Sequence, residues 1–264
     1  MKFSAYQATR IGGRSYNQDR VAYAYSDKAL LLVLADGMGG HLHGEVAAQI
    51  AIHTFMQAFE QAAQPRVPEP MEFLRDIVRH AHDAIIQYAR SQRLGGNPGT
   101  TCVAALVQDG QVCWAHAGDS RFYLLRGGKT VAVTHDHSVV QQWADWGIIS
   151  PEEMKTHPDR NKITNCLGGV EDMFYAESTP AVQLQPGDVL LLCSDGLWGP
   201  LNDEDVETTF STASLPVALE QLMDKALSQG GARADNTTAV VARWGDGEEE
   251  RAAPAPVCMV LDVS

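Results

Sequence analysis

Near its N-terminus the chain reads Leu30-Leu31-Leu32-Val33-Leu34-Ala35-Asp36-Gly37, an apolar run that ends in an aspartate and a glycine. A second apolar run, 189–193, is followed in the same way by Ser194-Asp195-Gly196. Continuous apolar runs of this length are typical of buried strands, and glycine lets the backbone approach a ligand closely. Both aspartates should therefore leave a sheet at turns, and two such carboxylates suggest a site for a hard metal ion.

Other apolar and β-branched runs predict further strands, most of them antiparallel. They lie at 21–25, 101–107, 112–117, 122–125, 131–133 and 237–242. Asp109-Gly110 and Gly127-Gly128 each separate two neighbouring runs, and such pairs are strong signals for hairpin turns. Apolar residues at helical spacing instead mark 45–62, 73–88 and 216–228. We therefore expect antiparallel sheet layers covered by helices.

The composition is that of a large acidic domain. With 264 residues, 45% of them hydrophobic, the chain can form one substantial core. Its formal net charge of −13 argues against binding to nucleic acid, which needs a basic surface. Five cysteines without a Cys-x-x-Cys pair predict neither a disulfide framework nor a zinc knuckle. The apolar runs are too short to cross a bilayer, so we expect no membrane insertion. We also expect a cytoplasmic protein that is a monomer.

Three more aspartates, Asp19, Asp119 and Asp235, stand beside predicted strands. Mg²⁺ and Mn²⁺ prefer carboxylate, carbonyl and water oxygens as ligands. Two such ions close together can clamp a phosphate group and generate hydroxide at neutral pH. A single Asp-Gly pair is most often only a turn, but five aspartates at strand ends can build a site of this kind.

The order of these segments along the chain points to one family. The segments are Arg14-x-x-Asn17-Gln18-Asp19, residues 36–41, Gly99-Thr100-Thr101, Gly118-Asp119-Ser120-Arg121, Asp136-His137-Ser138, Ser194-Asp195-Gly196 and Asp235-Asn236-x-Thr238. In this order they resemble the bacterial PPM family, the PP2C-type metal-dependent protein phosphatases, over about residues 5–244. The resemblance implies an α+β fold: a four-layer α-β-β-α sandwich of two antiparallel sheets, with a metal centre at one end.

The resemblance also implies roles for the acidic residues. Asp36 would bridge two Mn²⁺ or Mg²⁺ ions, and the carbonyl of Gly37 would bind one of them. Asp195 and Asp235 would hold the other ion. Asp19 would act through ordered water.

Two further residues match family positions around this centre. Asp119, with Asp195, matches a weaker third metal site of bacterial relatives; an aspartate that caps a hairpin is the alternative. Arg14 matches the arginine that binds phosphate, because its planar fork can hold two phosphate oxygens. The implied reaction is hydrolysis of phosphoserine or phosphothreonine in phosphorylated proteins, in opposition to a bacterial Ser/Thr kinase, by direct attack of a hydroxide that bridges the two ions.

Four positions depart from the family pattern. Gln18 replaces a glutamate in the water shell of one metal, which predicts weaker metal binding. Met38 stands where many eukaryotic members have a histidine proposed as the general acid. His41 is therefore a candidate proton donor, although a structural hydrogen bond is an equal alternative for it. Asn165 and Cys166 stand where relatives often have arginine and alanine. We interpret the cysteines as core residues rather than nucleophiles.

Residues 138–169 contain short helical pieces and resemble the mobile flap that bacterial members place beside the active site. A packed insertion without functional motion is an equal alternative. His135 and His137 flank Asp136, but no cysteine or further histidine completes a zinc set, and we expect a solvated loop. Residues 1–244 then form one phosphatase domain. Residues 245–264 form an acidic linker and a short tail, whose last residues either add an edge strand or extend freely.

Two other functions are compatible with the sequence. The chain could be a regulatory module that binds phosphoproteins without turnover; the neutral Gln18 favours this, whereas the intact Asp36, Asp195, Asp235 and Arg14 argue against it. It could also hydrolyse a small phosphorylated molecule with the same metals. The sequence favours the protein phosphatase.

Overall fold

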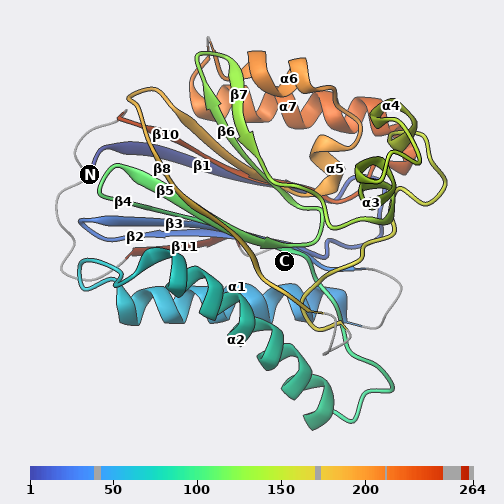
Figure 1. Cartoon of the computed structure of the whole chain (residues 1–264), viewed down its shortest axis with the longest axis horizontal. Helices are drawn as coiled ribbons and strands as arrows, with labels where there is room; N and C mark the ends of the chain where they lie inside the picture. Colours follow the sequence, from blue (N-terminus) through green and yellow to red (C-terminus); the bar gives the residue numbers. More distant parts are fainter. Residues whose placement is uncertain (39–42, 170–173, 212, 246–256, 262–264) are drawn as a thin grey trace.

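Two antiparallel β-sheets, stacked face to face, form the centre of the molecule, and helices cover the outer face of each sheet (Figure 1). The computed structural model describes residues 1–38, 43–169, 174–211, 213–245 and 257–261. The predicted α-β-β-α sandwich is confirmed. No helix in these described parts is both long and apolar enough to span a membrane.

The first sheet carries helices from the C-terminal part of the chain. Its strands, in spatial order, are β1 (Phe3–Arg10), β10 (Thr237–Trp244), β9 (Val189–Cys193), β6 (Arg121–Arg126) and β7 (Lys129–Val133). Its outer side is covered by α5 (Asp195–Trp198), α6 (Asp203–Thr209), α7 (Leu215–Gly230) and the short 3₁₀ turn η2 (Gly231–Arg233). Buried leucines of β9 and α7 meet in one apolar cluster there.

The second sheet is covered by two long helices. Its strands, in spatial order, are β11 (Val257–Leu261), β2 (Asp19–Tyr25), β3 (Ala29–Asp36), β4 (Cys102–Gln108), β5 (Gln111–Ala117) and β8 (Glu177–Gln183). The helices are α1 (Gly44–Ala62) and α2 (Pro70–Ser91). They pack against each other and against the sheet through a second apolar cluster that includes Phe55 and Phe59.

Strand β3 shows why the first apolar run is continuous. Leu30 and Leu32 pack between the two sheets, whereas Leu31 and Val33 pack against the helices. Successive side chains of a strand point to opposite faces, and both faces of this strand are covered, so every position favours an apolar residue. The strand therefore brings Asp36, its last residue, to the edge of a fully packed layer.

Both predicted hairpins are present. Asp109 and Gly110, between β4 and β5, have φ values of 55° and 73°, and Gly127 and Gly128, between β6 and β7, have 57° and 74°. These left-handed values are typical of the two-residue turns that match the twist of antiparallel strands.

Some elements differ from the expectations. Strands β1 and β8 were not predicted, because both are edge strands with mixed burial and many polar residues. Residues 138–169 contain the expected helical pieces as α3 (Val139–Asp145) and α4 (Pro151–Met154), which start at the capping residues Ser138 and Ser150. Of the two alternatives for the C-terminus, the edge strand is the one observed: β11 pairs with β2.

Candidate metal centre

The two Asp-Gly segments meet at one end of the sandwich. Asp36 ends β3, Asp195 begins α5 directly after β9, and their carboxyl groups interact. A Cβ atom at Gly37 would lie 2.4 Å from a backbone oxygen at the start of α1, and one at Gly196 would lie 2.0 Å from the carbonyl of Asn236. Only glycine allows such approaches, so the glycines let the backbone bring both aspartates together.

Asp19 reaches this site from β2. It lies opposite Asp36 in the pairing of β2 with β3 and is completely buried. Its Oδ2 accepts a hydrogen bond from Ser194 Oγ at 2.9 Å. Its Oδ1 is buried and has no hydrogen-bond partner among the described residues. A buried oxygen without a partner is unfavourable unless a cation or water reaches it, and this agrees with a ligand that acts through water.

The carboxyl groups of the site repel one another. Burial raises the pKa of Asp36 well above its usual value, and the neighbouring charge of Asp19 adds to this effect. Burial also raises the pKa of Asp195, with Asp119 as the next largest cause. For Asp119, burial raises the pKa to about 7, and Asp136 contributes. Asp36 and Asp195 retain partial access to solvent, so divalent cations can reach the repelling charges and relieve them.

The aspartates that the structure describes do not form one tight group of ligand atoms. Among the described residues, no three of these aspartates bring ligand oxygens within 4.8 Å of one another. One ion with three carboxylate ligands requires a tighter group. Two ions held about 3.5–4 Å apart need ligands spread over a longer space. Carboxylate oxygens at the ends of neighbouring strands are ligands of the type that Mg²⁺ and Mn²⁺ prefer.

Arg14 is the cation at the edge of this group. Its Nη2 donates to Asp235 Oδ2 at 2.5 Å, and this hydrogen bond raises the pKa of the guanidinium. The side chain of Arg14 is 53% exposed, so it can turn toward a ligand. Asn236 fixes its loop, because Nδ2 donates to the carbonyl oxygens of Ile11 at 2.9 Å and Tyr16 at 3.1 Å.

Of the residues that depart from the family pattern, Gln18 lies closest to the site. Its backbone N–H donates to Asn236 Oδ1 at 2.9 Å, and its carbonyl accepts from Gly37 at 3.3 Å. Its side chain is 8% exposed, and Nε2 has no partner in the described part of the chain. A neutral amide thus stands unpaired beside the acidic group. His41 lies outside the described residues.

The expectation of a solvated loop around His137 was wrong. His137 is 4% exposed; its ring stacks on His116 at a centroid distance of 4.4 Å, and Nε2 contacts Glu177 Oε2 at 2.9 Å. Asp136 is also buried, whereas His135 remains exposed. The burial was not predictable because His116 and Glu177 belong to the neighbouring strands β5 and β8, far away in sequence.

His116, His137 and Glu177, the histidine cluster, are close enough to suggest a second metal site. The hydrogen bonds argue against it. Gly118 N–H donates to His137 Nδ1 at 3.2 Å and Asn165 Nδ2 donates to it at 2.9 Å, so the ring proton lies on Nε2 and points to Glu177. Burial lowers the pKa of both histidines, that of His116 to about 4. We interpret the cluster, with both imidazoles neutral, as a hydrogen-bonded support for the end of the segment 138–169.

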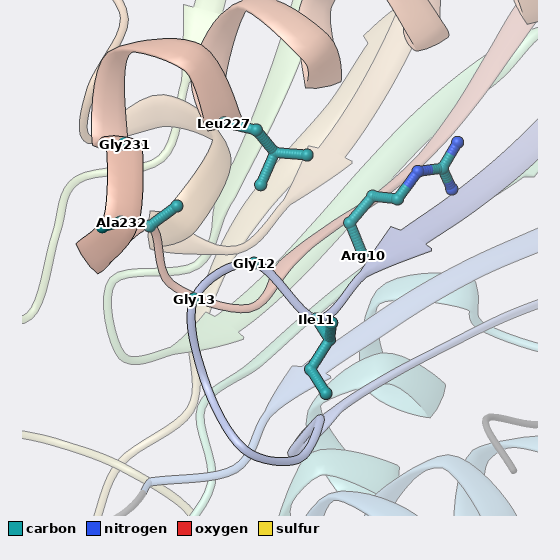
Figure 2. Close-up of a pocket in the computed structure, with 8 residues that line it drawn as sticks. Arg10, Ile11, Gly12, Gly13, Leu227, Gly231 and Ala232 are labelled. Atoms are coloured by element: carbon teal, nitrogen blue, oxygen red, sulfur yellow. The ribbon is translucent and has the colours of Figure 1, made fainter.

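A surface cavity of about 440 Å³ adjoins the loop that carries Arg14. Figure 2 shows Leu227 and the turn at Gly231 on one side of it, and the loop of Gly12 and Gly13 on the other. None of the candidate metal ligands lines this cavity. It is a separate feature beside the acidic group.

Comparisons with known proteins agree with this geometry. A family model described as protein phosphatase 2C matches residues 7–230. The chain belongs to the protein phosphatase 2C family. Similar members of the phosphatase 2C family include the serine/threonine phosphatase Stp of Listeria innocua, which is 34% identical over 231 residues, covering 86% of this chain and 90% of the relative.

Solved structures of the phosphatase 2C family have the same fold. Stp1 from Staphylococcus aureus superposes with a TM-score of 0.84 at 32% identity and covers 93% of this chain and 96% of its own. The catalytic domain of the phosphatase PstP, solved with two manganese ions, has a TM-score of 0.76 at 32% identity, with 91% and 97% covered. The predicted family resemblance is confirmed, and with it a metal-dependent class of enzyme.

The sequence did not reveal the polar residues that orient the aspartates. Ser194 donates to Asp19, and Asn17 Oδ1 accepts from the N–H of Asp19 at 3.0 Å. The hydroxyl groups of Thr9 and Thr238 share a 2.6 Å hydrogen bond that joins β1 to β10. Asn17, Ser194 and Thr238 lie in the segments that carry the family resemblance, although the sequence assigned them no role; Thr9 lies outside those segments.

Proposed function

We propose that this phosphatase 2C chain hydrolyses phosphoserine and phosphothreonine in proteins, with Mn²⁺ or Mg²⁺ as cofactor. One observation carries the proposal: the carboxyl groups of Asp19, Asp36, Asp119 and Asp195 gather at the end of the sheets, where burial and, to a lesser extent, neighbouring carboxylates raise their pKa values. A protein assembles such repulsion mainly where a cation is to bind.

The proposed ligands follow the positions of the side chains. Asp36 is central, because it interacts with both Asp19 and Asp195, and it would bridge two ions. Gly37 would contribute its carbonyl oxygen, and Asp195 and Asp235 would hold the second ion. Asp19 would act through water, using its unpaired Oδ1. Bound ions of this kind supply a hydroxide nucleophile at neutral pH and neutralise phosphate charge.

Arg14 would bind the phosphate group of the substrate. In the free protein its guanidinium pairs with Asp235, and its exposed position allows it to turn toward an incoming phosphate. The planar fork can donate two parallel hydrogen bonds to phosphate oxygens, which both orients the group and balances its charge.

The hydrolysis would proceed without a phosphorylated enzyme. The described cysteines are poor nucleophiles, because burial raises the pKa of Cys113 to about 11 and that of Cys193 to about 12. Thiolate, rather than thiol, is the reactive form. The reacting oxygen would therefore come from water rather than from a side chain.

The substrates would be phosphorylated proteins, and a Ser/Thr kinase would act in opposition. The net charge of −13 favours this over nucleic acid. We further propose a cytoplasmic monomer in which residues 1–244 form the phosphatase domain, with a flap at about 138–169 and an acidic linker and tail at 245–264.

The test is phosphate release from a phosphothreonine peptide by the full chain, with EDTA, Mg²⁺ or Mn²⁺, beside the variant Asp36→Asn. We expect turnover that depends on the metal and is lost in the variant. A regulatory module that only binds phosphoproteins, suggested by the neutral Gln18, predicts peptide binding without phosphate release under any metal. Release of phosphate only from small molecules would instead identify a different substrate class.

A further inference from the structure

Arg121 and Trp198 form a stacked pair between the segments that carry Asp119 and Asp195. The guanidinium carbon of Arg121 lies 3.5 Å from the centre of the Trp198 ring system. Arg121 also makes two hydrogen bonds to Asp136, Nε to Oδ1 at 2.8 Å and Nη2 to Oδ2 at 2.7 Å. The Asp136 side chain is 4% exposed and that of Arg121 is 18% exposed. The stacking face of the arginine is therefore held in one orientation.

Trp198 touches the Asp119 segment at a second point. Its Nε1–H donates to the backbone carbonyl of Asp119 at 2.9 Å. Asp119 and Arg121 are two residues apart at the start of β6, so the indole binds this turn by its ring face and by its ring edge. Such a double contact fixes both the distance and the rotation of the tryptophan relative to the turn.

Trp198 and Asp195 belong to the same short helix. Trp198 is the last residue of α5, which begins at Asp195 and contains only four residues. A helix this short is not stable alone, and Ser194, its N-cap residue, makes no side-chain capping bond. The orientation of Asp195 thus depends on contacts made by the rest of the turn: Leu197 packs in the apolar cluster below α7, and Trp198 contacts the Asp119 segment.

The contact opposes a repulsion. The carboxyl groups of Asp119 and Asp195 interact unfavourably, and two carboxylates on a turn and a one-turn helix would move apart unless other contacts held them. Arg121 offsets only part of this repulsion through its charge near Asp119, because its hydrogen bonds go to Asp136 and to the hydroxyl of Tyr123. The stacked pair links the two segments through the contacts of Trp198 with Arg121 and Asp119.

We propose that Trp198, stacked on Arg121, is a positioning residue that sets the separation of Asp119 and Asp195 and thereby the affinity for a divalent cation between them. The proposal rests on the proposed function, together with the weaker third ion that the family resemblance implies at these two aspartates. It assigns the stacked pair no contact with the substrate. Residues that orient metal ligands typically change metal affinity by roughly 10- to 100-fold when removed.

The test measures Mn²⁺ binding to the full-length metal-free chain by calorimetry, and phosphate release as a function of Mn²⁺ concentration. Trp198→Phe keeps an aromatic ring over Arg121 but loses the N–H donor to Asp119. Arg121→Lys loses the planar stack and is a second, independent variant. Arg126→Lys is the matched control, because Arg126 makes the same two-bond pair with Asp188 at the opposite end of β6.

We expect Trp198→Phe and Arg121→Lys to weaken the weakest Mn²⁺ site by roughly tenfold, to leave the tighter sites unchanged and to regain the rate at high Mn²⁺. Arg126→Lys should lower the melting temperature without changing any Mn²⁺ affinity. Unchanged binding in both test variants, or an equal loss at every site, would overturn the proposal while turnover by the unmodified chain keeps the phosphatase assignment. If the unmodified chain binds no Mn²⁺, both proposals fail.

Discussion

The two ends of strand β9 accommodate acidic residues in opposite ways. Asp188 directly precedes the strand and is 1% exposed, and Arg126 donates to both of its oxygens, at 2.8 and 2.7 Å. The N–H of Gln185 donates to it as well. Asp195, just past the other end of β9, lies among three carboxyl groups that repel it, those of Asp119, Asp235 and Asp19.

Under the proposed function, the difference separates a structural carboxylate from one that would bind a cation. At the Asp188 end each charge has a partner from the protein, as buried charges normally do. At the Asp195 end, the arginine nearest to the aspartates in sequence, Arg121, is committed to Asp136. Arg14 is more than half exposed; it makes an ion pair with Asp235 and interacts more weakly with Asp195 and Asp36. We propose that cations from outside the chain balance the remaining charge at this end.

Substituting one aspartate at each end should give opposite results. Asp36→Asn removes a repelled charge, so we expect turnover to fall by about three orders of magnitude while the metal-free chain unfolds at the same or higher urea concentration. Asp188→Asn removes a paired charge, so we expect a loss of about 2 kcal/mol in unfolding free energy with turnover retained. Urea unfolding and phosphate release test both variants.

Arg14 and Arg126 offer a second contrast. Arg14→Ala should raise KM by roughly tenfold, because it removes a charge-assisted hydrogen bond to the phosphate. Its effect on kcat should be smaller. Arg126→Ala should leave both kinetic parameters unchanged and only reduce stability. Equal KM values for Arg14→Ala and the unmodified chain would remove the arginine from the phosphate site.

The pH dependence of stability should distinguish the two ends without substitutions. The raised pKa values of Asp36, Asp119 and Asp195 mean that the folded metal-free chain keeps protons that the unfolded chain, with aspartate pKa values of about 4, has released. Stability must then fall as pH rises through about 7, the folded pKa of Asp119. His116 has the opposite effect below about pH 6.5, so the useful window lies above that value.

Thermal melts from pH 6.5 to pH 8 measure this effect. We expect the melting temperature of the metal-free chain to fall by a few degrees, which corresponds to a loss on the order of 1 kcal/mol in unfolding free energy. Saturating Mn²⁺ should abolish this fall. A melting temperature that rises across this window without metal would show that the aspartates are not crowded as described.

Local patterns account for much of the fold that could be predicted from the sequence. The apolar run of β3 was clear because both of its faces are covered, and the hairpin at Asp109-Gly110 was clear because its backbone angles favour such residues. Strands β1 and β8 were missed because edge strands tolerate polar residues on an exposed face. Local patterning carries no comparable signal for them.

The site was predictable only in part, because its members come from distant parts of the chain. That Asp36 and Asp195 end buried runs could be read locally, but the 2.9 Å hydrogen bond from Ser194 to Asp19 joins residues 175 positions apart. That these distant residues form one site was predicted from the family resemblance. His137 shows the limit of both routes, because its burial depends on His116 and Glu177, which meet it only in three dimensions.

The central claim is that the aspartate end of β9 is completed by divalent cations. Calorimetric titration of Mn²⁺ into the metal-free chain at pH 7.5, beside Asp36→Asn and Asp188→Asn, tests it most directly. The account predicts at least two Mn²⁺ per unmodified chain, loss of the tight binding in Asp36→Asn, and unchanged binding in Asp188→Asn. Equal binding by the unmodified chain and Asp36→Asn, or no binding by either, would contradict it.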